Sequence, residues 1–483
     1  MRRRERPLLP VNCTTKRVMT RCASGPLPLP FIYPLLFNNV GTTRFLLILF
    51  AAGLPFLCSC TRDRAAGLEV DGALESELRQ VTAIDNHAHP MAVVTYGEED
   101  HDYDALPADA IADLALPPPF REGSNYFPPA WHALFGYPYS DARVDHVSAV
   151  SKARQEMMKQ KGDLYPSWVL NHTSTDIMLA NRVAMGRGLP SDRFKWVPFV
   201  DMFLFPLNNS SAKSKDPEHN AFFGREEALL KGYLAAAQMR KIPSTFDEYL
   251  SFVSHTLESW KSSGAVAVKF ELAYLRDLQI SHPPRESAER VYTIYAQSSE
   301  PSAEEYKILQ DYLFRHLARE AGRLGMPVHI HSSIGAGSYF RTSNADPLAL
   351  ESVFNDPSLR RTKFVMLHGA WPFAPQAAAL ILKPNVYVDY SGFSYLTYPA
   401  EAARALRLYL EAAPERVLYG SDASPFSSSV GWEETAWLGA HYGRLALEIA
   451  LTGMMHDGEI TLDGAKSLGR KVLRENARQL YGF

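Results

Sequence analysis

Short runs of apolar and β-branched residues recur along the chain from about residue 80 onward. In order they are VTAID (81–85), TDIMLAN (175–181), KWVPFVD (195–201), AVAVKFEL (265–272), PVHIHS (327–332), KFVMLHG (363–369), NVYVDYS (385–391) and RVLYGSD (416–422). Stretches with helical character separate them, and strands that alternate with helices are typical of parallel βαβ units. Eight such units predict a fold of the α/β class, a (β/α)₈ or TIM barrel, over residues 80–483.

Helix signals support this alternation around PVHIHS. The preceding helix has apolar residues at about every 3.6 positions and is followed by Gly325 as a stop; these positions are Tyr306, Leu309, Leu313, Leu317 and Leu324. The next helix is expected to open at ADPLALESVF, with Asp346 as the N-cap and Pro347 as the first helical residue.

Three long segments interrupt the pattern, at residues 92–165, 204–262 and 276–304. Each follows a predicted strand, so each is expected to project over the face of the barrel where the strands end. Loops and inserted helices of this length cover or shape a binding site, or else decorate the surface.

Charge and cysteine content divide the chain into two parts. Residues 1–59 contribute +7 and the rest −10 to the net charge of −3. An acidic body argues against nucleic acid as a partner. All four cysteines lie within the first 60 residues, which excludes a thiolate metal site or a cysteine nucleophile in the barrel.

The N-terminal part, residues 1–60, is interpreted as a targeting segment. Arg44 precedes 14 uncharged residues, FLLILFAAGLPFLC, which suits the apolar region of a signal peptide. The sequence LCSC resembles a lipoprotein cleavage box with Cys60 as the lipidated residue, and an ordinary signal peptide or short anchor is the alternative. Residues 1–39 fit neither, so translation is expected to start near Val40. These features predict a cell-envelope or periplasmic protein that meets a membrane only through Cys60; a cytoplasmic location is the alternative.

Histidines and one aspartate stand at the ends of four predicted strands. His87 and His89 follow VTAID, and residues two apart in a strand point the same way, so both imidazoles can face the barrel mouth. His331 ends the fifth run, whereas His329 lies deeper and is expected to pack in the core or support a ligand. His368 ends the sixth run and Asp422 the eighth. Each of these two residues has a structural alternative to a role in catalysis: His368 as the end of a strand, and Asp422 as the cap of the next helix.

In a barrel these strand ends converge on one axis. The resulting nitrogen and oxygen donors suit zinc or another divalent ion with positions left for water. A bound cation lowers the pKa of its water to about 7. Asp422 can then act as a metal ligand and general base, and His368 can bind a second metal, polarise a carbonyl or protonate a leaving group.

Lys269 lies inside the apolar fourth run, where a buried ammonium is costly unless it is paired. Three interpretations stay open: a carboxylated lysine bridging two metals, a substrate contact, or an ion pair with Glu271 on the same face.

The motifs IDNHAHP, VHIHSS, VMLHGAWPF and LYGSDASP resemble the metal-dependent amidohydrolase superfamily, in its amidohydrolase-related branch. Residues from HIHSSIGAGSYFRTSNADP through VYVDYSG are similar to the amidohydrolase domain fused to a glutamine synthetase-like domain in nodulin-type proteins; no such second domain is expected here. The resemblance implies that His87, His89, His331 and Asp422 bind one or two divalent ions, most simply Zn²⁺. It implies that His368 is catalytic or binds a second metal. Arg341 matches an arginine of the similar domains, where it would bind a substrate carboxylate; a salt bridge at the helix entry is the alternative.

These features predict a metal-dependent hydrolase of a small-molecule amide, ester or lactone. The alternatives are a decarboxylase or sugar-acid isomerase that uses the same site, and a catalytically silent lipoprotein that binds a ligand there. The oligomeric state has no signature in the sequence.

Overall fold

The computed structural model describes residues 69–483, except 96–97, 108–110, 112–123, 297–298 and 428. The predicted targeting segment, with Cys60, lies outside the described residues. Within them, no helix is both long enough and apolar enough to cross a lipid bilayer.

All eight predicted strands are present. They are β1 (Ala83–Ala88), β2 (Thr175–Asn181), β3 (Phe194–Val197), β4 (Val268–Phe270), β5 (Val328–His331), β6 (Phe364–Leu367), β7 (Val386–Asp389) and β8 (Val417–Leu418). Neighbouring strands pair in parallel in the orders β1-β2-β3 and β4-β5-β6-β7-β8. Bridges from Phe199 to Lys269 and from Ala88 to Ala423 join the two groups. The strands thus close into the predicted barrel.

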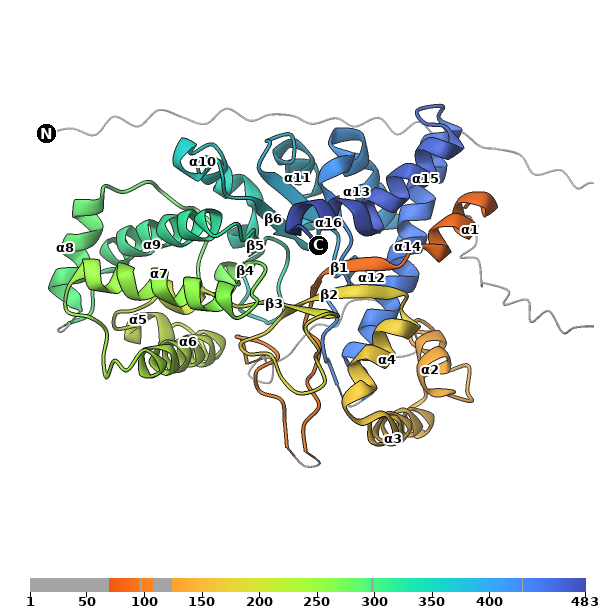
Figure 1. Ribbon diagram of the computed structural model, residues 1–483, viewed down its shortest axis with the longest axis horizontal. Coiled ribbons are helices and arrows are strands. Elements are labelled where there is room, and N and C mark those ends of the chain that lie inside the picture. Colours follow the sequence, from red (N-terminus) through yellow and green to blue (C-terminus); the bar gives the residue numbers. More distant parts are fainter. Residues whose placement is uncertain (1–68, 96–97, 108–110, 112–123, 297–298, 428) are drawn as a thin grey trace, which may run out of the picture. The chain divides into compact units, whose positions relative to one another are not determined.

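Helices surround these strands (Figure 1). Helix α1 (Gly72–Gln80) leads into β1. Between β1 and β2 lie α2 (Pro128–Phe135), α3 (Val144–Lys161) and α4 (Tyr165–His172); between β3 and β4 lie α5 (Ser210–Lys213), α6 (Pro217–Ala236) and α7 (Phe246–Ser262). Helices α8 (Arg285–Tyr295) and α9 (Ala303–Arg323) precede β5, α10 (Glu351–Phe354) precedes β6 and α11 (Ala374–Leu380) precedes β7. Helices α12 (Phe393–Leu396) and α13 (Pro399–Ala412) precede β8, and α14 (Trp432–His456), α15 (Leu462–Arg470) and α16 (Asn476–Tyr481) follow it.

Two helix predictions can be compared with the structure in detail. Helix α9 begins with a capping box between Ser302 and Glu305 and buries the predicted apolar face, and Gly325 follows it with a φ of 67°. After β5, the Asp346 side chain accepts a hydrogen bond from the Leu348 amide, as expected of an N-cap. The segment that it caps begins as a 3-10 turn and becomes α-helical only in α10.

The inserted segments pack against different parts of the barrel. In the first segment, the Tyr165 hydroxyl of α4 donates a hydrogen bond to Glu433 of α14 at 2.7 Å. The carbonyl oxygen of Tyr103 lies 3.3 Å from Nδ1 of His89. In the third, Tyr292 of α8 packs 5.2 Å from Tyr249 of α7, between ring centroids, and α8 also contacts α9. Helix α8 therefore lies with α7 and α9 at the left of Figure 1, and projection of this segment over the strand ends stays a prediction.

The interior of the barrel is apolar below the strand ends. Its buried residues come from five strands, from the position just before β4 and from α16: Ile84, Leu179, Val197, Ala267, Val365, Leu367, Leu418 and Ala477. On α16, the Tyr481 hydroxyl donates to Asn86 Oδ1 and lies 2.7 Å from Nε2 of His329. His329 is therefore a hydrogen-bonded core histidine, and the polar residues above it face the other end of the barrel.

Candidate metal centre

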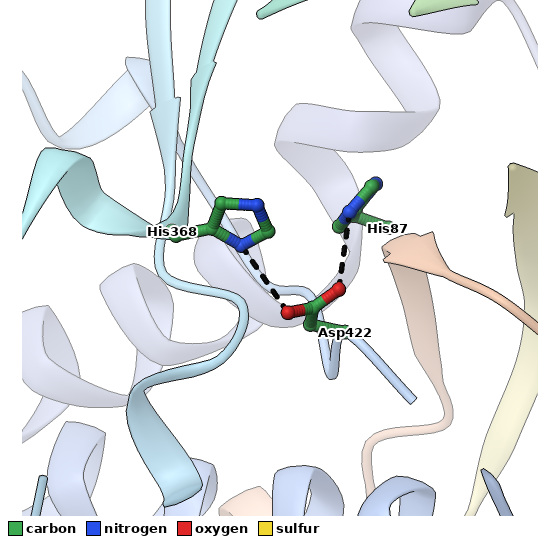
Figure 2. A group of neighbouring side chains, drawn as sticks. All are labelled: His87, His368 and Asp422. Atoms are coloured by element: carbon green, nitrogen blue, oxygen red, sulfur yellow. Dashed lines mark ion pairs between the residues drawn. The ribbon is translucent and has the colours of Figure 1, made fainter. Parts of the chain in front are cut away.

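Three of the predicted site residues meet at the carboxyl ends of the strands. His87 lies on β1, His368 follows β6 directly, and Asp422 follows β8. The Asp422 amide donates to the His87 carbonyl oxygen at 2.7 Å, which fixes the two strand ends side by side. One ligand atom from each of the three residues lies within 4.8 Å of the other two, a spacing compatible with one metal ion (Figure 2).

The carboxylate of Asp422 faces three imidazoles. Its Oδ1 lies 3.2 Å from His87 Nε2 and 3.6 Å from His89 Nε2, and its Oδ2 lies 3.5 Å from His368 Nδ1. The Asp422 side chain retains 16% exposure, while the imidazoles retain 5% or less. The group is therefore nearly closed, with its carboxylate as the most accessible member.

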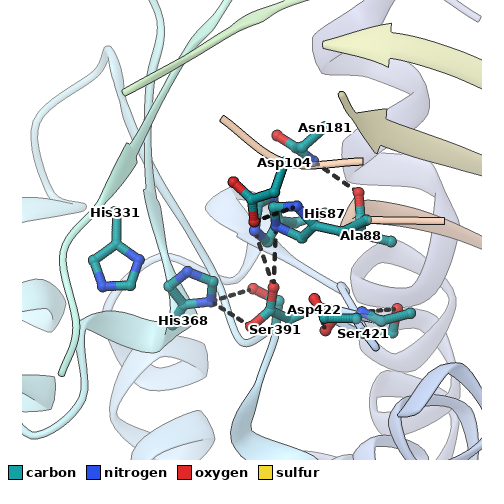
Figure 3. Close-up of polar contacts among 12 residues, drawn as sticks. His87, Ala88, Asp104, Asn181, His331, His368, Ser391, Ser421 and Asp422 are labelled. Carbon is teal, nitrogen blue, oxygen red and sulfur yellow. Dashed lines mark hydrogen bonds and ion pairs between the residues drawn. The ribbon is translucent and has the colours of Figure 1, made fainter. Parts of the chain in front are cut away.

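His331 lies on the far side of His368 from this group (Figure 3). Its ring centroid is 4.7 Å from that of His368, and its Nδ1 is 3.8 Å from Glu271 Oε2. The structure thus brings all five predicted residues to one strand-end cluster. The group whose ligand atoms lie within 4.8 Å of one another, however, contains His368 and not His331. The assignment of His87, His89, His331 and Asp422 as the ligand set stays a prediction.

The environment keeps these imidazoles neutral and therefore able to bind metal. Burial, with the Lys269 ammonium as a second cause, lowers the pKa of His89 to about 4 and of His331 to about 3. Burial also lowers the pKa of His87 and His368 well below the usual value. Both ring nitrogens of His87 and Nε2 of His331 are buried without a hydrogen-bond partner in the described part of the chain. Such unsatisfied nitrogens are costly unless a ligand occupies them, so these donors fit a divalent ion.

The backbone is strained where two of these residues stand. His368 has a φ of 59° and Asp422 a φ of 55°, in the left-handed region that few side chains adopt. Gly369 has a φ of 57°, and a Cβ there would lie 2.5 Å from the Phe393 ring. Strain of this kind persists where the surrounding structure imposes it, commonly at functional sites.

A shell of hydrogen bonds orients the ligand side chains. Ser391 Oγ lies 3.0 Å from His368 Nδ1 and donates to Asp389 Oδ1 at 2.7 Å. Asn86 donates to the other oxygen of Asp389 at 2.7 Å. The hydroxyl of Tyr395 donates to Asp422 Oδ2. These contacts fix the imidazole and the carboxylate from the side away from the ligand space.

Lys269 and Arg341 have different surroundings. Lys269 Nζ lies 2.6 Å from Glu271 Oε1, with both side chains 5% or less exposed. This is the ion pair that was one of the three interpretations. Arg341 is exposed and follows Phe340, whose ring centroid is 6.0 Å from that of His331. Within the described part of the chain no carboxylate lies within 4.0 Å of its guanidinium, so the helix-entry salt bridge is not formed there. Substrate binding by Arg341 stays a prediction.

Several polar residues of the site were not predicted. Asp201 ends the third run, and Asp389 lies two residues before the end of the seventh, so a position near the end of a run, which identified Asp422, could have identified them too. Asp104 lies in the first insertion, with Oδ2 3.3 Å from His89 Nδ1, and Glu226 lies on α6 of the second. Nothing in the local sequence distinguishes these two from other acidic residues.

Comparisons with known proteins agree with this geometry. Residues 288–483 match the family model described as amidohydrolase, in agreement with the resemblance that the motifs indicate. Protein fluG of Emericella nidulans is 25% identical over 229 residues, which are 45% of this chain and 25% of that protein. The chain therefore spans about a quarter of the length of this curated relative.

Solved structures include two that match over most of the chain. One, from Lactobacillus casei, is named provisionally as a metal-dependent hydrolase; it is 16% identical, with a TM-score of 0.54, over 86% of this chain and 98% of its own. It shows the same fold. The other is a uronate isomerase from Thermotoga maritima, 12% identical with a TM-score of 0.49, over 86% of this chain and 98% of its own.

Proposed function

We propose that the protein hydrolyses an amide, ester or lactone bond of a small molecule with the help of a bound divalent metal. The observation that carries the proposal is the meeting of His87, His368 and Asp422 within 4.8 Å at the strand ends. In barrels of this kind the strand ends are where catalytic residues gather. The unsatisfied nitrogens of His87 and His331 supply the neutral donors that such a metal needs.

His87, His89, His331 and Asp422 would hold the ion, with His368 as a further ligand. A divalent ion supplies Lewis acidity, which acidifies water and polarises a carbonyl. Nitrogen and carboxylate donors without sulfur suit Zn²⁺. Because the Lys269 ammonium is already paired with Glu271 at 2.6 Å, we propose a single ion and no bridging lysine.

Asp422 would move the proton of the reaction. Burial raises the pKa of its carboxyl well above the usual value, so it holds a proton more readily than an exposed aspartate. Tyr395 fixes Oδ2 by a hydrogen bond, which leaves Oδ1 to take a proton from water and pass it to the leaving group.

His368 is oriented for a different task. Because Ser391 donates its own proton to Asp389, its oxygen accepts from Nδ1 of His368. Nε2 then carries the lone pair, which suits a metal ligand better than a proton donor.

An activity screen with a matched variant tests the proposal. Purified protein would be assayed with γ-glutamyl amides, N-acyl amino acids and lactones, beside a double variant His87→Ala/His89→Ala and a chelator-treated sample. We expect hydrolysis that falls by about 1,000-fold or more in the variant, because metal assistance is worth several kcal/mol. Zinc should restore the chelated wild type only.

Two results would sink the assignment. Equal hydrolysis by wild type and double variant would place the activity elsewhere. Release of CO₂ from aromatic acids, or isomerisation of sugar acids, without any hydrolysis would assign the site to one of the alternative reactions.

We further propose that the partner is a small-molecule substrate rather than nucleic acid, and that the protein resides in the cell envelope, anchored through Cys60. The sequence LCSC and the apolar stretch before it support this location. Mass spectrometry of the protein from membranes, beside Cys60→Ser, tests it: a wild-type N-terminus other than a lipidated Cys60 would contradict the anchor.

A further inference from the structure

Three buried carboxyl groups, those of Asp201, Glu226 and Glu271, lie with the partly buried Asp104 beside the candidate metal centre, on the side of β3 and β4. Asp104 Oδ2 is 3.3 Å from His89 Nδ1, and Glu271 Oε2 is 3.8 Å from His331 Nδ1. Behind them, the Glu271 amide donates to Asp201 Oδ2 at 2.8 Å. The cluster therefore begins at the metal centre and extends away from it.

Glu226, on α6, forms the far end of this cluster. Its side chain is 1% exposed, and neither of its carboxylate oxygens has a hydrogen-bond partner among the described residues. Its electrostatic neighbours include the carboxyls of Asp201, Glu271 and Asp104. The Oδ1 atom of Asp201 is likewise buried without a partner. Three buried oxygens thus lack a donor on the same side of the site.

Among the residues that the structure describes, the nearby cations do not satisfy these oxygens. Lys269 is committed to Glu271 Oε1 at 2.6 Å. Arg225, the residue next to Glu226, directs its guanidinium to the His101 carbonyl oxygen at 2.9 Å and to Asp102 at 3.7 Å. Burying unpaired carboxyls is expensive, so a cluster with an excess of acids is suited to a cationic ligand.

The ligand is an organic cation rather than a second metal ion. Among the described residues, the group of His87, His368 and Asp422 is the only one whose ligand atoms come close enough to hold an ion. The four carboxyls are therefore spread too widely for a metal cage. A protonated primary amine carries three N–H donors on a flexible chain and can match separated oxygens.

We propose that Asp201 and Glu226, supported by Asp104 and Glu271, form a subsite for the protonated amino group of the substrate. The inference rests on the proposed function: the bond to be hydrolysed lies at the metal centre, and the alkylammonium arm of the same molecule extends toward α6. The preferred substrates are then amides or esters that carry a primary amino group a few carbons from the scissile bond.

Binding of a simple amine tests the subsite without any catalysis. Calorimetric titration of the full chain with n-butylamine at about pH 7.5 should show binding, and the isosteric n-butanol should bind at least about tenfold more weakly, because hydrogen bonds to charged groups exceed neutral ones. Glu226→Gln should weaken amine binding by about tenfold or more. The matched control is Glu227→Gln on the same helix, whose side chain is 40% exposed and paired with Lys213, and it should bind amine as wild type does.

Catalysis provides the second measurement. For two matched N-acyl amides, one with a 4-aminobutyl and one with an n-pentyl leaving group, kcat/KM should favour the first by about tenfold or more in wild type. Glu226→Gln should abolish this preference by lowering kcat/KM for the 4-aminobutyl amide about tenfold or more. If no amide is hydrolysed but n-butylamine still binds through Glu226, the proposed function fails and the subsite stands.

Three outcomes would overturn the subsite. They are equal binding of amine and alcohol by wild type, unchanged amine binding by Glu226→Gln, and displacement of the amine by millimolar Mg²⁺ from a site that includes Glu226. The first would mean that Glu226 is merely a protonated buried side chain. The last would make the cluster a metal site.

Discussion

Ser391 connects the core of the barrel to the candidate metal centre. Its hydroxyl donates to Asp389 and accepts from His368 Nδ1, so it determines which nitrogen of that imidazole carries the lone pair. A hydrogen-bonded partner of this kind fixes the ring orientation and the tautomer of a ligand histidine.

Replacing Ser391 by alanine should therefore weaken metal binding without unfolding the protein. We expect Ser391→Ala to lower zinc affinity by about 10- to 100-fold, the usual effect of losing a residue that orients a ligand. Competition with a chromogenic chelator measures it. Ser394→Ala is the matched control, because the Ser394 hydroxyl is also buried but has no partner. Equal zinc affinity in the two variants would mean that Ser391 does not orient His368.

At this scale, what could be predicted from sequence depends on where a residue stands. His87, His331, His368 and Asp422 end predicted strands, and barrel geometry alone brings such ends together. Glu226 belongs to a long inserted helix, and its place at the site depends on how that helix packs. For Lys269, the alternation of a strand indicates which face it shares with Glu271 but not whether they pair.

At the scale of elements, the strands were easier to predict than the helices. Strands of a parallel barrel are buried on both faces and appear as continuous apolar runs. The connection from β2 to β3, residues 182–193, contains no helix. It turns tightly through Gly188, with a φ of 83°, and a Cβ on Gly186 would lie 2.4 Å from the Ala92 side chain. This turn depends on contact with the distant first insertion, so local sequence could not show that a helix is missing.

The interface between α7 and α9 contains a histidine that makes stability depend on pH. Burial lowers the pKa of His316 from 6.5 to about 4, and its Nε2 lies 3.1 Å from Ser254 Oγ of α7. Between these two pH values the unfolded chain binds a proton that the folded protein does not. The contribution of His316 to the free energy of unfolding is therefore fully present above pH 6.5. It decreases as the pH is lowered, by up to about 3 kcal/mol near pH 4.

His316→Gln should remove this part of the pH dependence. Urea unfolding of wild type and variant, followed from about pH 7.5 to pH 4.5, should show a smaller loss of stability in the variant. His132→Gln, at an exposed position, should follow wild type. A wild-type profile in both variants would mean that His316 is not buried as a neutral imidazole.

At the scale of the whole molecule, the last helix closes the barrel opposite the metal centre. Ala477 of α16 packs with interior residues of five strands and with Ala267 before β4, and the Tyr481 hydroxyl donates a hydrogen bond to Asn86, the residue before His87. Asn86 in turn donates to Asp389, which holds Ser391. A continuous chain of hydrogen bonds thus runs from the closing helix to the imidazole of His368, across residues far apart in the sequence.

Removing one hydroxyl from this chain should cost stability and disturb the site together. In Tyr481→Phe, Asn86 Oδ1 and His329 Nε2 both lose their partner in a buried environment, which should lower the free energy of unfolding by about 1–3 kcal/mol. Tyr390→Phe is the matched control, because that buried hydroxyl has no partner, and it should change stability little. Denaturant unfolding gives the first readout and zinc affinity the second. If Tyr481 acts only within the closing helix, Tyr481→Phe should lower the free energy of unfolding and leave zinc affinity unchanged. The chain of hydrogen bonds predicts that the variant also binds zinc more weakly, because Asn86 and Asp389 then orient His368 less firmly.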